Sequence, residues 1–541
     1  MIRYLQSSET RGAKMNLTTI VKAVAMSIMA ATMLAAGPAR AEWLKAESRN
    51  FVIYSQGTES SLRRYARTLE LYDYILRAGM GMPLDAPPAR QLPIFLVHGR
   101  NGLLEIHPGS PPHAAGTYFP ASEGIFAAAF SDREMDFLLH EYFHHFSFQN
   151  GTAAQLPGWL VEGLAEYFMT AEVRGNTVRI GNYNANRADW LLNANWLPLE
   201  ELLSKRPREI TRTGHRDTYY PVAWLMTHWF MSDDTRRGQL GAYEQAVSGG
   251  ADPVDAMESA TGMTLAEIRS ALRSYMRGSL QIRIYEINRP EPEITVTRLP
   301  ESADDLLLLG QRLKVGVPED QRAATAALVR QRAARHPDDP FAMLQLGHAE
   351  LHFGEPEAGE AVLLRLLEIE PTNVEALQLL ASRHMRLAAG DPENGETHMR
   401  RARGYLGRAY SANNEQYYTL YMLAQTREGG PGYPNENDLL TWHLAYERAP
   451  QLTGIRLGYA SALMEAEEYG TAIALLEPLA NAPHGGGSSD AAQELLERAR
   501  AGAAPFTRDE RDAVEEAAST SPTQPDQDAS QPAEPEPAEG T

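Results

Sequence analysis

Residues 138–146, with the sequence LLHEYFHHF, constrain the fold of this chain more than any other segment. His140 and His144 stand four residues apart, a spacing that places two side chains on one face of an α-helix. Leucine and aromatic residues surround them at helical spacing, which predicts a helix packed into a core. Asn150-Gly151 is a typical end for such a helix. The segment is therefore predicted to be a buried helix that presents both imidazoles on the same side.

A second apolar segment, residues 157–172, carries a glutamate that can join the two histidines. It opens with a proline, which suits the first turn of a helix, and it contains Glu162. If the two helices pack together, the carboxylate of Glu162 converges with the imidazoles of His140 and His144. Two imidazoles and a carboxylate, with a position left for water, are a ligand set of catalytic zinc sites. We therefore expect one Zn²⁺ at this point.

Glu141 directly follows the first histidine and can reach a water molecule on the metal. Zinc lowers the pKa of such a water to roughly 7, but a base must still accept its proton. The alternative is that His140 and His144 are core histidines and that Glu162 is a solvated carboxylate. Burial of Glu141 among apolar neighbours without a metal would be unfavourable, so the metal site is the stronger interpretation.

The sequences HEYFH and WLVEGLAEYF together resemble the gluzincin (peptidase MA-like) metallopeptidases, in which a glutamate on the next helix is the third zinc ligand. Seventeen residues, 145–161, separate His144 from Glu162, close to the usual gap in that family. The resemblance implies that these two residues and the first histidine are the ligands and that Glu141 is the general base. It also implies that Glu166, one turn after the ligand glutamate, orients a ligand histidine.

Residues 219–232 predict a further apolar helix, which begins with two tyrosines. The segment resembles a helix of peptidase MA-like domains in which a leading tyrosine donates a hydrogen bond to the oxyanion that develops during hydrolysis. The resemblance implies this role for Tyr220, with Tyr219 and His215 as alternatives. A further alternative is that both tyrosines only line the core.

Residues 42–288 combine strand and helix patterns. Strands are expected at 51–54 and 93–97, a helix at 59–78, and mostly helices after the zinc-site segments. This order suits the α+β zincin-like catalytic domain that the resemblance implies. Residues 124–130 predict another strand, which in gluzincins forms the edge of the substrate cleft. The alternative for this strand is a position in the core.

Residues 302–501 are repetitive and helical in pattern. Pro337 and Pro371 end successive units 34 residues apart, and Pro450 and Pro483 end two more that are 33 residues apart. This period resembles tetratricopeptide repeats and implies about five helix–turn–helix units in an all-α superhelix. Such a superhelix has a concave surface that can dock a substrate or a protein partner. The alternative is a plain spacer.

Three segments are expected to lie outside these domains. Residues 1–41 match a secretory signal peptide, with an apolar stretch followed by the cleavage site Ala39-Arg40-Ala41. Residues 289–301 are a predicted linker, and the acidic, Pro-rich residues 502–541 are predicted to be disordered. The signal predicts export to the periplasm or the medium of a bacterium, with no stable membrane insertion after cleavage behind Ala41.

The composition narrows the chemistry. A formal charge of -20, from 50 basic and 70 acidic residues, argues against a nucleic-acid partner. The absence of cysteine leaves histidine and carboxylate as metal ligands. We therefore predict an exported zinc-dependent metallopeptidase that acts on a peptide or protein substrate. The alternatives are a repeat-based binding or scaffold protein with an inactive peptidase-like domain, and a zinc amidase that acts on cell-wall peptides.

Overall fold

The computed structural model describes residues 42–514, except for short gaps. The gaps are residues 111–113, 133–134, 152–155, 175–176, 184, 279, 287–290, 392, 481–485, 509 and 512. The predicted signal peptide of residues 1–41 lies outside the described residues, as does the tail from residue 515 onward. The described residues from Trp43 onward form one compact unit. Every helix among them is too short or too polar to cross a lipid bilayer.

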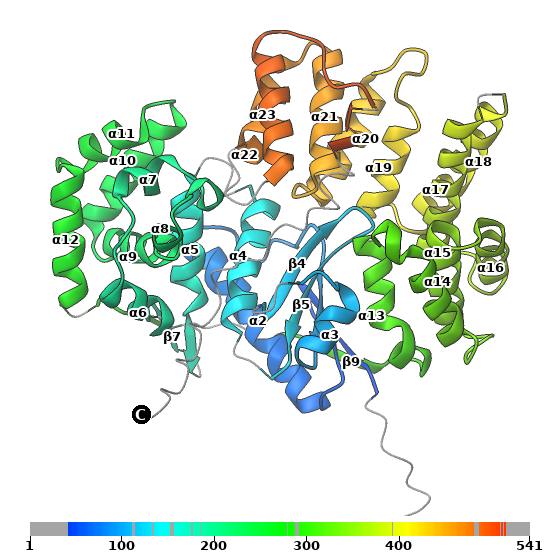
Figure 1. The fold of residues 1–541 in the computed structure, drawn as a ribbon, viewed down its shortest axis with the longest axis horizontal. Coiled ribbons are helices and arrows are strands. Elements are labelled where there is room, and N and C mark those ends of the chain that lie inside the picture. Colours follow the sequence, from blue (N-terminus) through cyan, green and yellow to red (C-terminus); the bar gives the residue numbers. More distant parts are fainter. Residues whose placement is uncertain are drawn as a thin grey trace, which may run out of the picture. The chain divides into compact units, whose positions relative to one another are not determined.

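The first part of the chain is built around a mixed β-sheet (Figure 1). From one edge to the other, its strands are β4 (Gly116–Ala121), β5 (Gly124–Phe130), β3 (Leu92–Val97), β2 (Phe51–Ser55), β1 (Leu44–Glu47) and β9 (Thr295–Arg298). β3 runs parallel to both of its neighbours, and the other neighbouring strands are antiparallel. Side chains alternate between the faces of a strand, so Ile94 and Leu96 enter one core while Phe95 and Val97 enter another.

Helices cover both faces of the sheet. On the face with Ile94 lie α2 (Glu59–Gly79) and α4 (Asp136–Gln149), and on the opposite face lie α3 (Gly99–Ile106) and α13 (Ser302–Val315). The predicted histidine helix is α4, which ends as expected with Asn150 as its C-cap and Gly151 at φ +67°. Because α4 contacts β4 and β5, its histidines are held near one edge of the sheet.

Two predictions about the sheet are corrected by the structure. Residues 124–130 form β5, but β5 lies between β3 and β4, so β4 is the outermost strand on this side. A strand with partners on both sides cannot pair with a peptide, so β5 is not the cleft edge. It is the buried core strand that was the alternative prediction. Within the predicted linker of residues 289–301, residues 295–298 form β9 and pair with β1. Its β-branched residues favour a strand over a linker.

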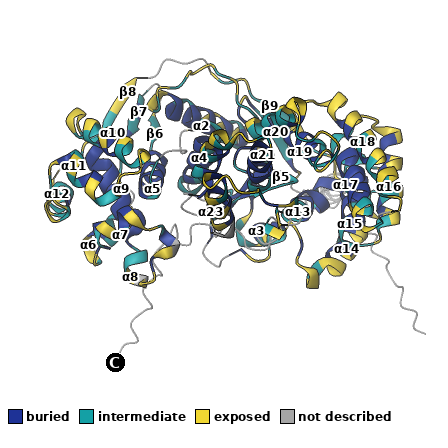
Figure 2. Ribbon diagram, turned by 90° about the horizontal axis from the view of Figure 1, so that it is seen from above, coloured by how far each residue is buried: buried dark blue, intermediate teal, exposed yellow. Residues whose placement is uncertain are grey.

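After α4 the first part of the chain is mainly helical. Its elements are α5 (Gly158–Met169), β6 (Glu172–Arg174), β7 (Thr177–Ile180), α6 (Ala185–Asn193), α7 (Leu199–Ser204), η1 (Pro207–Glu209), α8 (Thr213–Arg216), α9 (Tyr219–Met231), α10 (Asp234–Ser248), α11 (Pro253–Thr261), α12 (Leu265–Arg277) and β8 (Arg283–Glu286). β6, β7 and β8 form a separate antiparallel sheet. α5 and α9 pack against each other and are almost fully buried (Figure 2).

Gly163 allows α5 and α9 to approach closely. A Cβ at this position would lie 2.7 Å from the carbonyl oxygen of Ala223 and would overlap the hydroxyl of Thr227. Gly163→Ala is therefore expected to destabilise the protein by about 1–3 kcal/mol, because the helices must move apart. The control is Gly241→Ala in α10, where a Cβ meets nothing within 4 Å; it is expected to stabilise by about 0.5–1 kcal/mol. Chemical denaturation measures the free energy of unfolding of both variants. An equal change in the two would contradict the close contact at Gly163.

From Ser302 onward the described residues form helices and loops without strands. After α13 the helices are α14 (Glu319–Ala333), α15 (Pro340–Phe353), α16 (Pro356–Ile369), α17 (Val374–Gly390), α18 (Gly395–Ala412), α19 (Tyr417–Gln425), α20 (Glu436–Arg448), α21 (Thr453–Glu465), α22 (Tyr469–Ala480) and α23 (Gly486–Arg500). Consecutive helices pack together, as α15 does on α16 and α17 on α18. Pro337, Pro371 and Pro450 lie between helices, and Pro483 lies outside the described residues. The predicted order, a mixed α/β part followed by helices, is confirmed.

The disordered tail was predicted to begin at residue 502, but residues after this point are still packed against the helices. Phe506 is only 4% exposed and belongs to an apolar core that α21, α22 and α23 contribute. The guanidinium of Arg498 lies 4.5 Å from the centre of its ring, and Arg511 pairs with Glu428. Stacked helices leave an apolar face at the end of their array, and burial of Phe506 covers part of it. The chain is therefore packed beyond residue 502.

Candidate metal centre

Three predicted ligands meet where α4 packs against α5. The Nε2 atoms of His140 and His144 lie 3.1 Å apart, and each lies 3.4 Å from Oε2 of Glu162. The three residues are 3%, 9% and 0% exposed, respectively. Their donor atoms are close enough to hold a single metal ion between them. Of the three, His144 is the most exposed.

Contacts to neighbouring elements fix the rotation of α4. The hydroxyl of Tyr142 donates to Oδ1 of Asp73 on α2 at 2.7 Å, and Arg77 donates to the other carboxylate oxygen at 2.8 Å. On the side of α5, the rings of Phe143 and Phe168 stack with their centroids 5.9 Å apart. Since Tyr142 and Phe143 lie between the two histidines in the sequence, these contacts hold the imidazoles toward Glu162.

Glu166 lies behind the first histidine and is itself held by an arginine. Its Oε1 is 3.4 Å from Nδ1 of His140, and Arg187 on α6 donates to both carboxylate oxygens at 2.6 and 2.9 Å. Burial alone would raise the pKa of Glu166, but Arg187 and the hydrogen bond from His140 lower it to about 2. An ionised Glu166 keeps the proton of His140 on Nδ1, which leaves Nε2 available to a metal. Arg187 carries no local sequence signal, because it lies 21 residues away on another helix.

Arg187→Met is expected to destabilise the protein by about 3–5 kcal/mol at pH 7, because the charge of Glu166 remains buried without compensation. Folding lowers the pKa of Glu166 from 4.5 to about 2. Its contribution to stability is therefore present above about pH 4.5 and is lost as the pH falls toward 2. Chemical denaturation at several pH values gives the free energy of unfolding of each protein. The difference between wild type and variant should shrink as the pH falls across that range.

The control for this prediction is Arg174→Met, which removes a surface ion pair. Arg174 and Glu172 lie 3.3 Å apart, with side chains 75% and 45% exposed. An exposed pair of this kind contributes roughly 0–1 kcal/mol. A similar loss in both variants, or a difference for Arg187→Met that does not change with pH, would contradict the buried pair.

Glu141 is half-buried, whereas the residues on either side of it are buried. Its charge acts on Tyr118 of the outermost strand β4. Burial is the main cause that raises the pKa of Tyr118; Arg90 and a hydrogen bond from Gln451 oppose the rise, and Glu141 adds to it. The Tyr118 hydroxyl also lies 2.9 Å from Nδ1 of His145. His145 therefore contacts the outermost strand β4.

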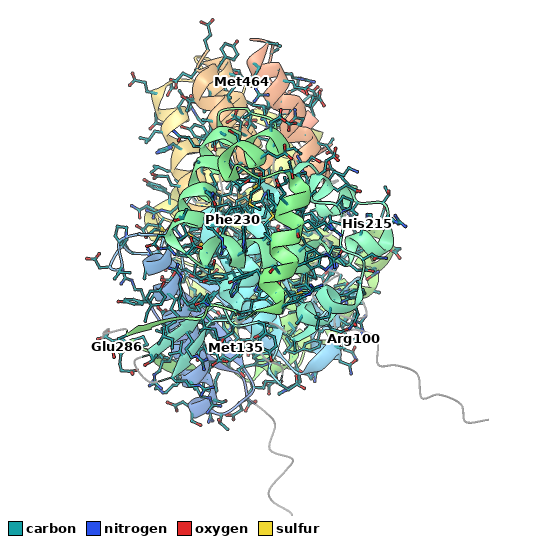
Figure 3. The ribbon with its side chains drawn as sticks, turned by 90° about the vertical axis from the view of Figure 1, so that its left-hand side faces the viewer. Arg100, Met135, His215, Phe230, Glu286 and Met464 are labelled. Atoms are coloured by element: carbon teal, nitrogen blue, oxygen red, sulfur yellow. The ribbon has the colours of Figure 1, made fainter. Side chains whose placement is uncertain are left out.

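The three candidates for the oxyanion donor lie in different surroundings. Tyr220 is next to the ligand group, with its ring centroid 6.5 Å from that of His140. The hydroxyl of Tyr219 instead donates to the carbonyl oxygen of Lys205 at 3.3 Å. His215, labelled in Figure 3, lies in α8 with Nδ1 3.6 Å from a carboxylate oxygen of Glu201. Tyr220 is therefore the best placed of the three.

The predicted site residues come from α4, α5 and α9, apart from His215 on α8, and α6 adds Arg187. His140, His144 and Glu162 form the donor group, and Glu166 lies on its buried side. Tyr118 and Arg187 belong to the surroundings of the site but were not predicted. In comparisons with known proteins, no family model matches the chain, and no curated protein sequence matches it.

Proposed function

We propose that the protein is a zinc-dependent metallopeptidase of the gluzincin type, with a zincin-like catalytic domain followed by a tetratricopeptide-like superhelix. The separations of the donor atoms carry this proposal. Zn²⁺ bound at 2.0–2.1 Å in tetrahedral geometry has ligand atoms roughly 3.3 Å apart. The three measured separations are 3.1, 3.4 and 3.4 Å. Imidazole and carboxylate donors also suit zinc, so the residues fit this ion.

Each residue around the donor group has its own role in the proposed hydrolysis. A zinc ion, when bound, supplies the Lewis acidity that makes water a nucleophile near neutral pH. Glu141 accepts the proton of that water and returns it to the leaving amine. Tyr220 donates a hydrogen bond to the oxyanion that develops on the substrate carbonyl. Glu166 acts through His140, whose ring it orients.

The outermost strand β4 supports an extended peptide as the substrate. In the described part of the sheet β4 pairs only with β5, so its other edge has no strand partner. An extended peptide can add to such an edge through backbone hydrogen bonds. The hydroxyl of Tyr118 in this strand lies 2.9 Å from Nδ1 of His145 on α4. A peptide along β4 would therefore pass close to the histidine helix.

The C-terminal helices contact the region around the site, which supports a role in docking a substrate or partner. Gln451, after α20, donates to the Tyr118 hydroxyl at 3.3 Å. Gln149, at the end of α4, donates to the carbonyl oxygen of Glu447 at 3.1 Å. A ligand held by these helices would lie near β4 and the end of α4. We place the enzyme in the periplasm or outside the cell on the basis of its sequence pattern.

A peptide library incubated with the purified protein tests the proposal. Mass spectrometry should find cleaved peptide bonds, and a zinc chelator should abolish cleavage until zinc is restored. Cleavage that is unaffected by the chelator would contradict a zinc enzyme. Cell-wall peptides are tested in the same way, and cleavage of these alone would support an amidase. Binding of peptides without any cleavage would support the scaffold alternative.

A further inference from the structure

A second group of histidines and a carboxylate joins the sheet to the helical part of the chain. Glu123 lies in the turn between β4 and β5, and His348 and His352 lie four residues apart on α15. Nε2 of His348 is 3.0 Å from Oε2 of Glu123, and Nδ1 of His352 is 3.7 Å from Oε1. The donor atoms of the three residues lie within 4.8 Å of one another.

His348 is the least accessible member of this group. Its side chain is fully buried, its Nε2 lies 3.0 Å from Oε2 of Glu123, and its Nδ1 has no hydrogen-bond partner among the described residues. Buried charged groups in proteins are paired or coordinate a metal. A cation at this point would take the place of the proton between Nε2 of His348 and Oε2 of Glu123.

The charge state and the orientation of His352 suit a metal ligand. Burial lowers the pKa of His352 to about 3, although Glu123 opposes this effect, so its imidazole is neutral at pH 7. Its Nε2 lies 3.4 Å from the hydroxyl of Ser382, which leaves Nδ1 directed toward Glu123. A neutral imidazole is the form in which histidine binds a metal.

We propose that Glu123, His348 and His352 bind a second divalent cation of the zinc class. Imidazole donors favour Zn²⁺ or similar transition metals over Mg²⁺ and Ca²⁺. The ion would fasten the β4–β5 turn to α15, beside the contact in which the Tyr417 hydroxyl donates to the carbonyl oxygen of Ser122 at 3.1 Å. Because β4 continues from this turn to Tyr118, the ion also holds the edge strand in place. This site does not depend on the proposed peptidase activity.

Zinc content distinguishes the two sites. The purified protein is stripped with a chelator, reloaded with zinc, freed of excess by gel filtration and assayed by elemental analysis. Wild type is expected to hold two equivalents per chain, and both H140A/H144A and H348Q/H352Q are expected to hold one. Zinc should raise the melting temperature of H140A/H144A, because its second site remains. Circular dichroism checks that each variant is folded.

Glu123→Gln is the milder test, since it preserves the shape of the turn and removes only the charge. It should also lose one equivalent of zinc. The control is H336Q/H443Q, which removes two histidines of the helical part outside the group and should keep both equivalents. If H348Q/H352Q and Glu123→Gln hold as much zinc as wild type, the second site is wrong. Unchanged zinc in H140A/H144A would instead overturn the first site.

Discussion

Glu141→Gln is expected to reduce peptide hydrolysis by roughly 10²–10⁴-fold, the usual contribution of a general base. Glutamine has the shape of glutamate but cannot accept a proton from water at neutral pH. The bound zinc should remain, because Glu141 is not one of the three residues in the donor group. Steady-state kinetics on a peptide identified in the library, together with the zinc content of the same sample, measures both expectations.

A matched control separates the base from a general effect of lost charge. Glu200 lies in the first turn of α7 and is exposed. Glu200→Gln removes one negative charge away from the site and should leave hydrolysis unchanged. If Glu141→Gln hydrolyses peptides as fast as wild type, Glu141 is not the base. If it loses zinc as well as activity, its role is structural and the assignment also fails.

His140→Ala is expected to remove the zinc ion of the candidate centre and with it all measurable hydrolysis. Only two donors would remain, His144 and Glu162, and the contact that Glu166 makes to Nδ1 of His140 would be lost as well. The variant should therefore hold one equivalent of zinc less than wild type after dialysis against buffer with low free zinc. Elemental analysis of the dialysed protein gives this number directly.

His145→Ala is the control on the same helix. His145 is as deeply buried as the ligands, but its Nδ1 contacts the Tyr118 hydroxyl at 2.9 Å. Its removal should therefore leave the zinc content unchanged. Equal zinc loss in both variants would mean that the loss reflects a disturbed α4 and not a missing ligand. Retention of full zinc by His140→Ala would exclude His140 as a ligand.

These two variants also separate the proposed enzyme from the scaffold alternative. A scaffold with an inactive domain can bind zinc, so zinc loss in His140→Ala alone does not establish catalysis. Loss of hydrolysis in Glu141→Gln with zinc retained requires a group that takes part in the reaction. The pair of results is therefore more informative than either measurement alone.

Much of the donor group could be predicted because its pattern is local. A four-residue spacing on a helix brings two side chains to one face by the geometry of the backbone alone. The apolar residues of α4 and α5 also showed that both helices are buried, and α4 ends at the residues where its end was expected. Two buried helices that follow each other closely have few ways to pack, so Glu162 could be paired with the histidines.

Contacts between distant segments could not be predicted, because the periodic pattern of residues within a segment carries no information about its partner. Arg187 reaches Glu166 from another helix, and Gln451 reaches Tyr118 across 333 residues. The position of β4 outside β5 follows from strand pairing, which the alternation of residues within one strand does not specify. The same holds for β9, whose partner β1 lies at the opposite end of the first part.

By itself, the amino-acid sequence determined the helices, the histidine spacing and the order of a mixed part followed by helices. Only the tertiary structure decided which strand lies at the edge and which residues surround the donor group. It alone brought Glu123 to His348 and His352, more than 200 residues further along the chain. The physical reason is that backbone geometry sets contacts within a helix, whereas burial of apolar surface across the whole fold sets contacts between remote segments.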